Sequence, residues 1–136
     1  MIHDHPFTTP HRSAVARPYL TVALFNPLSG IRRKVMALID TGADECALPA
    51  LYAPLLGHEL SAGLIKEVGT GNGITTAYSH TVCIEIFSFS SGDVQIDFMP
   101  NLTTPLLGVK SFLSNFILEI DYCRKVFSLT LPAERI

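Results

Sequence analysis

The chain has 136 residues, of which 48% are hydrophobic and 16% are charged, and its formal net charge is −2. This composition is that of one folded domain of ordinary size and argues against an intrinsically disordered chain. The slightly acidic net charge also argues against a nucleic-acid-binding surface, because phosphates require a basic patch.

The cysteines and the lengths of the apolar runs indicate in which cellular compartment the protein is expected. Three widely separated cysteines without CxxC spacing predict neither a disulfide framework nor a zinc site. The N-terminal stretch lacks the apolar core of a secretory signal, and no later run reaches the ~20 residues of a membrane span. We therefore expect a cytoplasmic protein with no metal, no other cofactor and no membrane partner.

The pattern of apolar and polar residues changes once along the chain, at residue 19. Residues 1–18 contain three prolines and no sustained periodicity, so they are predicted to form an irregular arm ahead of a folded domain at 19–136. From there, β-type runs alternate with turn residues. The predicted strands are 19–25, 34–40, 65–68, 74–89, 94–99, 116–120 and 126–131, and the predicted short helices are 49–56 and 109–113. Many short strands without βαβ alternation indicate a mostly antiparallel β fold.

The most informative segment is 36–44, in which an apolar strand ends abruptly at Asp40 and is followed by Thr41 and Gly42. An acid at the end of a buried strand is positioned by the fold. Peptide hydrolysis by paired acids needs two carboxyl groups that share one proton: one activates a water and the other donates to the carbonyl oxygen. A homodimer with its two-fold axis beside Asp40 would supply the second carboxyl group.

The neighbours of Asp40 suit this arrangement. Thr41 offers a hydroxyl that can link two such loops across the axis, and Gly42 lets the backbone turn close beside the acid. The alternative is an ordinary strand-end acid in a turn, because Asp, Thr and Gly are all common turn residues.

A second informative segment is the glycine-rich run Val-Gly-Thr-Gly-Asn-Gly at 68–73, between two predicted strands. It is either a mobile hairpin tip or a plain β-turn. A phosphate-binding loop would require a helix directly after it, and the next residues read as a strand.

The segment Leu-Ile-Asp-Thr-Gly-Ala at 38–43 resembles the active-site motif of the retropepsin family, which comprises retroviral proteases and their cellular and bacterial relatives. Three further features follow in that family's order. The run at 68–73 resembles the flap hairpin, residues 105–113 resemble the strand and short helix behind the aspartate loop, and the strands after 116 are similar to those that pair across the dimer. The resemblance covers residues 19–131.

The resemblance implies a closed antiparallel β-barrel-like acid protease fold with one or two short helices, acting as a homodimeric aspartic endopeptidase on peptide or protein substrates without a cofactor. Asp40 would be the catalytic residue, supported by Thr41 and Gly42. The residues that match substrate-binding positions are Ala43, Asp44, Gly69, Thr70 and Gly71. We expect apolar lining around Leu38, Ile74 and Leu106.

One departure from the retroviral pattern concerns Asp44. Val109 stands where those proteases usually carry an arginine that pairs with the acid matching Asp44, so Lys110 or Arg124 is the expected substitute. Asp44 would either contact the substrate backbone or cap the local turn.

One further alternative applies to the whole site, and one interpretation concerns its neighbour Cys46. A retropepsin-like fold can also serve as a catalytically silent module for peptide binding or dimerisation, because fold does not determine activity. Cys46, close to the motif, is interpreted as a buried structural thiol, since no histidine accompanies it.

Overall fold

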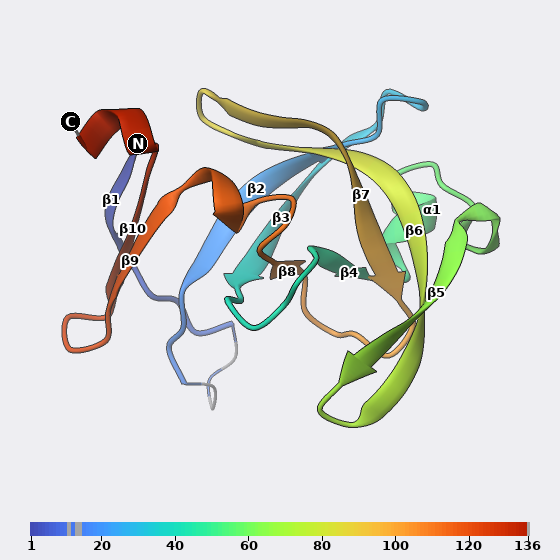
Figure 1. The fold of residues 1–136 in the computed structure, drawn as a ribbon, viewed down its shortest axis with the longest axis horizontal. Coiled ribbons are helices and arrows are strands. Elements are labelled where there is room, and N and C mark those ends of the chain that lie inside the picture. Colours follow the sequence, from blue (N-terminus) through green and yellow to red (C-terminus); the bar gives the residue numbers. More distant parts are fainter. Residues whose placement is uncertain (11, 13–14, 136) are drawn as a thin grey trace.

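The structure, a computed structural model, describes residues 1–10, 12 and 15–135, and short strands dominate it (Figure 1). The strands are β1 (Ile2–Pro6), β2 (Tyr19–Phe25), β3 (Arg32–Ile39), β4 (Ala47–Pro49), β5 (Leu64–Thr70), β6 (Gly73–Ile86), β7 (Phe89–Met99), β8 (Leu106–Leu107), β9 (Ile117–Asp121) and β10 (Val126–Thr130). The helices are α1 (Tyr52–Leu55) and the 3₁₀ turns η1 (Leu60–Ala62), η2 (Leu113–Asn115) and η3 (Pro132–Arg135). The predicted mostly β fold is confirmed.

A seven-stranded sheet in the order β2-β3-β8-β4-β7-β6-β5 holds most of the chain. β2 also pairs with β6, so the sheet returns onto its first strand and β5 extends beyond this closed ring. Most neighbours are antiparallel, as predicted. β3–β8 and β4–β7 are parallel pairs, because the loops that precede β4 and β8 bring the chain back across the sheet in the same direction.

The end of the chain forms a second, three-stranded sheet in the order β1-β10-β9. The predicted irregular arm at 1–18 is therefore wrong for its first residues, since Ile2–Pro6 is β1 and pairs with β10. Ile2 lies opposite Leu129 and is buried. The pairing joins opposite ends of the chain, so local periodicity carries no signal of it. Residues 11, 13 and 14 of the predicted arm lie outside the described residues.

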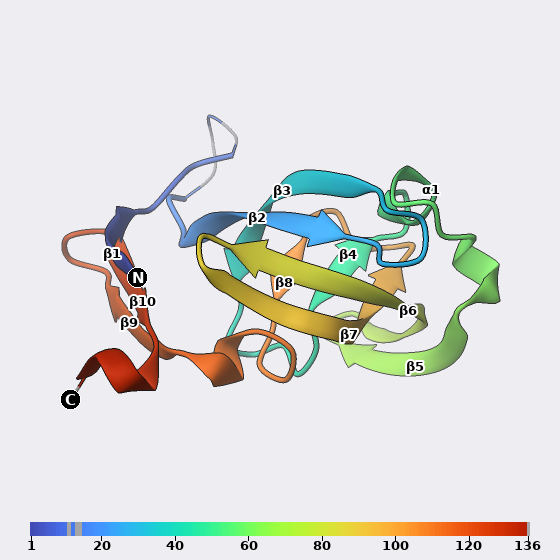
Figure 2. The same cartoon turned by 90° about the horizontal axis from the view of Figure 1, so that it is seen from above.

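One apolar cluster joins the two sheets. Seen from above, the sheet of β1, β9 and β10 occupies one end of the molecule and the β5–β6 hairpin with α1 the other (Figure 2). The inward side chains of alternate strand positions pack together between them. Side chains that are at most 2% exposed in this cluster include Val22, Leu24, Ile84, Ile96, Phe98, Phe112, Phe127 and Leu129.

The short helix predicted at 109–113 is not formed; the chain makes turns there, followed by η2. The N–H groups of Val109 and Lys110 donate to the carbonyl oxygens of Ala43 and Asp44 at 2.9 and 2.8 Å. The segment is shaped by its contact with the loop after Asp40, which outweighs its local helix preference. Among the described residues, no helix is long and apolar enough to span a lipid bilayer.

The terminal sheet should be part of the cooperative core. We expect Phe127→Ala, at a side chain with no exposed surface, to lower the free energy of unfolding by about 3 to 5 kcal/mol, because it leaves a cavity between the two sheets. The matched control is Phe87→Ala, at a side chain that is 87% exposed, with an expected change within about 0.5 kcal/mol. Urea denaturation followed by circular dichroism measures both, and equal losses would contradict the assignment.

Candidate active site

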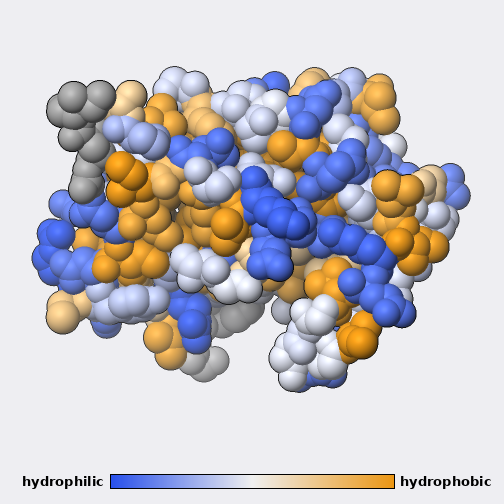
Figure 3. Space-filling view, viewed as in Figure 1, coloured by the Kyte–Doolittle hydropathy of each residue, from blue (hydrophilic) through white to orange (hydrophobic). Residues whose placement is uncertain are grey.

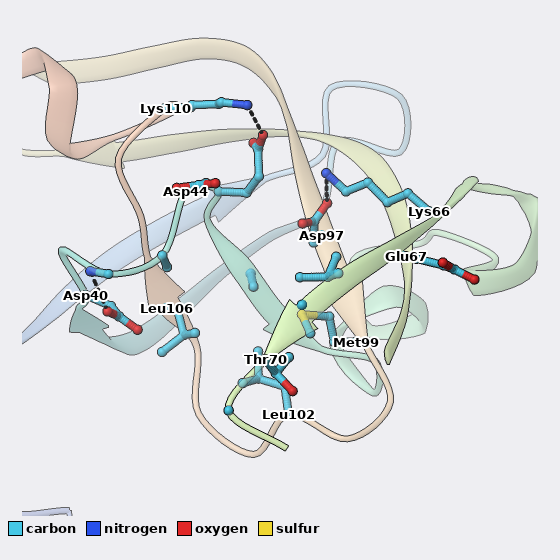
Figure 4. A pocket seen from close by; sticks show the side chains of 17 residues that line it. Asp40, Asp44, Lys66, Glu67, Thr70, Asp97, Met99, Leu102, Leu106 and Lys110 are labelled. Atoms are coloured by element: carbon cyan, nitrogen blue, oxygen red, sulfur yellow. Dashed lines mark hydrogen bonds and ion pairs between the residues drawn. The ribbon is translucent and has the colours of Figure 1, made fainter. Parts of the chain in front are cut away.

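Asp40 follows the last residue of β3, and backbone contacts hold it on both sides. Its N–H donates to the carbonyl oxygen of Leu107 at 3.1 Å, which extends the β3–β8 pairing by one residue. Its Oδ1 accepts a hydrogen bond from the N–H of Gly42 at 3.0 Å. The carboxylate is half-buried and its direction is set by this turn (Figure 4).

Gly42 is needed beside this carboxylate for a steric reason. A Cβ at residue 42 would lie 3.3 Å from Asp40 Oδ1, tighter than ordinary van der Waals contact. A larger side chain would therefore press on the carboxylate that the Gly42 N–H holds. Thr41, between the two, is exposed.

Gly108 packs directly behind the loop that follows Asp40. A Cβ at residue 108 would lie 2.2 Å from the carbonyl oxygen of Glu45 and 2.7 Å from that of Ala43. No side chain fits at this point, so the backbones of 43–46 and 107–110 lie in close contact. The contact supports the loop that follows Asp40.

Cys46 also contributes to the contact between Gly108 and the loop that follows Asp40. The N–H of Gly108 donates to Cys46 Sγ at 3.3 Å, and the thiol is buried. Burial raises the pKa of Cys46 to about 11, which keeps the sulfur protonated at neutral pH. Cys46 is thus a buried structural thiol, as the sequence predicts, and not an activated nucleophile.

Asp40 opens onto a cleft of about 740 Å³. Of the predicted site residues, Thr41 is not part of the lining. The cleft is lined by Asp40, Gly42, Ala43, Asp44, Glu45, Ala47, Lys66, Glu67, Val68, Gly69, Thr70, Gly71, Asp97, Met99, Leu102, Leu106 and Lys110. The space-filling view shows a notch on this side of the molecule, bounded by the β5–β6 hairpin (Figure 3).

The predicted apolar lining is only partly right. Leu106 lines the cleft, but Leu38 and Ile74 do not, and Ile74 is 75% exposed on the hairpin. The apolar lining comes instead from Val68 and from Met99 and Leu102, at and after the end of β7. Sequence reasoning missed Met99 and Leu102, because the pairing of β7 with β4 brings them to the site.

The β5–β6 hairpin borders the cleft and ends in a polar tip. Thr70 Oγ1 donates to the carbonyl oxygen of Gly73 at 2.9 Å and accepts from the N–H of Asn72 at 3.2 Å. Gly73 has a φ of +108°, a conformation that favours glycine. The polar Thr70 and Asn72 thus hydrogen-bond within the tip itself.

Two ion pairs lie in the wall of the cleft. Lys66 Nζ lies 2.9 Å from Asp97 Oδ1, and Lys110 Nζ lies 3.1 Å from Glu45 Oε1 (Figure 4). Burial raises the pKa of Asp97, and Lys66 opposes that shift only in part. The hydrogen bond to Glu45 raises the pKa of Lys110. Asp97 was also missed, although a lone acid in the apolar run 96–99 was a usable signal.

Neither cation expected beside Asp44 pairs with it among the described residues. Lys110 pairs with Glu45, and Arg124 pairs with Asp121 and Asp4 in the terminal sheet. The reason is topological, since β9 and β10 carry Arg124 away from the cleft. In the part of the chain that the structure describes, no three His, Cys, Asp or Glu side chains are grouped to hold a metal ion.

The contact behind the Asp40 loop should be essential for stability. We expect Gly108→Ala to lower the free energy of unfolding by more than about 2 kcal/mol, because the added methyl meets backbone atoms that cannot move aside. Gly69→Ala is the matched control, since a Cβ there meets nothing within 4 Å. Thermal unfolding of both variants tests this, and a wild-type midpoint for Gly108→Ala would disprove it.

Comparison with known proteins identifies the fold. No protein-family model and no curated protein matches the sequence. A crystal structure of a retropepsin-like aspartic protease from Rickettsia conorii is similar, with a TM-score of 0.60 and 23% identity over 81% of this chain and 89% of that one. EIAV protease in complex with an inhibitor gives a TM-score of 0.54 and 19% identity over 74% and 88%. The chain therefore has a retropepsin-like fold, as the order of its motifs predicts.

Proposed function

We propose that this chain is an aspartic endopeptidase that acts as a homodimer and hydrolyses peptide bonds with a water activated by two Asp40 carboxyl groups, one from each subunit. The observation that carries the proposal is the placement of Asp40. It stands at the end of β3, oriented by the Gly42 N–H and supported from behind by β8, at a cleft of about 740 Å³ under a hairpin.

The chemistry follows from two carboxyl groups that share one proton. The ionised Asp40 takes a proton from the water as it attacks the peptide carbonyl carbon, and the protonated Asp40 donates to the carbonyl oxygen. The proton taken from the water is then available to the leaving amine. Two carboxyl groups close enough to share a proton cannot both carry a negative charge, so one of the pair stays protonated and can donate.

The surface around Asp40 suits a second copy of the chain. Thr41 and Gly42 are exposed in the single subunit, and Val109, directly behind the loop, is an apolar side chain that is 39% exposed. A two-fold axis beside Asp40 would place each of these opposite its own copy. The Thr41 hydroxyl would then have a partner loop to hydrogen-bond.

A peptide substrate would lie extended between the Asp40 loop and the hairpin. Ala43 and Asp44 line one side of the cleft, and Gly69, Thr70 and Gly71 line the other. Backbone groups on both sides can pair with an extended peptide, as in strand addition to a sheet edge. The exposed Asp44 carboxylate can accept an N–H from the peptide backbone, which is the role that the proposal assigns to it.

The test compares wild type with Asp40→Asn on a peptide library from about pH 3.5 to 7, at several protein concentrations. We expect the variant to lose about 10² to 10⁴-fold in rate, because it removes the acid–base pair. Wild-type activity should peak on the acid side, where one proton is shared, and decline as that proton is lost. At concentrations below the dimer dissociation constant, the rate should rise faster than linearly.

The matched control is Asp93→Asn, at an exposed aspartate of β7 outside the cleft, which should keep wild-type activity. Residual cleavage by Asp40→Asn at the wild-type rate would refute the assignment of Asp40. If wild type forms dimers and cleaves no peptide, the chain is a silent peptide-binding or dimerisation module instead.

A further inference from the structure

The cleft has two chemically different parts. Val68, Met99, Leu102 and Leu106 supply an apolar part, close to the hairpin tip. The ion pairs Lys66–Asp97 and Lys110–Glu45 supply a charged part at the other side, and Figure 4 shows both pairs on one side of Met99 and Leu102. Some side chains of a bound peptide would therefore contact apolar groups of the cleft, and others would contact charged groups.

Within both ion pairs, the lysine is the more exposed partner. The Lys66 side chain is 40% exposed and that of Asp97 is 4%; the Lys110 side chain is 67% exposed and that of Glu45 is 24%. The carboxylate is thus the more buried partner in each pair, and the lysine side chain is the more accessible one. A ligand in the cleft can therefore reach the lysines more easily than their carboxylate partners.

Each ammonium group has capacity to bind a further acceptor. A lysine carries three N–H donors, and the contact of Lys66 Nζ with Asp97 Oδ1 uses one of them. A second carboxylate can accept another N–H without breaking the first pair. The buried carboxylate also holds the lysine in place, which reduces the entropy lost when a ligand binds.

A cationic side chain fits this part of the cleft less well. To reach Asp97 it would have to displace Lys66 from a carboxylate that is almost fully buried. Three further acids line the cleft, Asp40, Asp44 and Glu67, and they do not change this conclusion. Asp40 is the catalytic acid of the proposed reaction. Asp44 acts on Lys110, whose pKa it raises, and Glu67 lies on the other face of β5 from Lys66, because side chains alternate along a strand (Figure 4).

We infer that the cleft selects peptides that carry an aspartate or glutamate side chain against Lys66 and Lys110, beside apolar side chains that face Val68, Met99 and Leu106. This inference rests on the proposed protease function and adds a substrate class to it. Lys66 is the main specificity-determining residue, because β5 carries it over the cleft and Asp97 fixes its position.

The first experiment measures kcat and KM for peptide sets that keep apolar residues around the cleaved bond and vary one flanking position among Glu, Gln and Lys. For wild type, we expect one position at which Glu is preferred over Gln by about fivefold in kcat/KM, mostly through KM, as for one exposed ion pair. Lys66→Gln should abolish this preference, and Lys66→Arg should keep it. Lys34→Gln, at an exposed lysine of β3 outside the cleft, is the matched control.

Lys66→Gln leaves Asp97 without its cation, so its fold must be verified by circular dichroism. Lys110→Gln is the second variant, since its partner Glu45 is more exposed and tolerates the loss better. It should weaken the same preference. A preference that neither variant changes, or wild-type cleavage that favours Lys or ignores charge, overturns the inference and leaves the protease proposal intact.

The second experiment separates recognition from turnover. Fluorescence anisotropy measures binding of the same labelled peptides to the Asp40→Asn dimer, which retains both lysines. About fivefold tighter binding of the Glu peptide than of the Gln peptide supports the inference, even if wild type cleaves nothing and the protease proposal fails. Equal binding, or tighter binding of the Lys peptide, overturns the inference independently of catalysis.

Discussion

The close backbone contact between Gly108 and the loop 43–46 is the constraint on which the site depends. Glycine is required there because backbone oxygens of the loop occupy the space of a side chain. The contact aligns β8 with β3, so the hydrogen bond from Asp40 to Leu107 can form. It also buries Cys46 and diverts residues 109–112 from a helix into turns. Because Gly108 has no side chain, this close backbone contact can form, and the contact positions Asp40, β8 and the segment after Gly108.

The same loop connects the site to the far wall of the cleft. β4 begins one residue after Cys46 and pairs in parallel with β7, which places Asp97 beside Ala47. Burial in the sheet makes ionisation of Asp97 unfavourable, and Lys66 from the hairpin strand compensates in part. The cleft is consequently apolar toward Leu106 and charged toward Lys66, although both parts arise from one closed sheet.

The terminal sheet of β1, β9 and β10 packs onto the core of its own subunit. β1 and β10 pair within the subunit and bury Ile2, Phe127 and Leu129 in the common core. This sheet is therefore part of the subunit's own fold. The exposed Thr41 and Gly42 lie instead on the Asp40 loop, where a catalytic pair would require the second subunit to approach.

The sequence by itself determined the strand pattern, the position of Asp40 at a strand end, the glycine-rich hairpin and the buried thiol. These features depend on local alternation, turn chemistry and short motifs, which are visible in a few consecutive residues. Only the tertiary structure decided the pairing of β1 with β10, the turns at 109–112, and the convergence of Lys66, Asp97 and Met99 on one cleft. These features depend on contacts between segments far apart in the chain, whose register is set by packing of the whole core and not by any local preference.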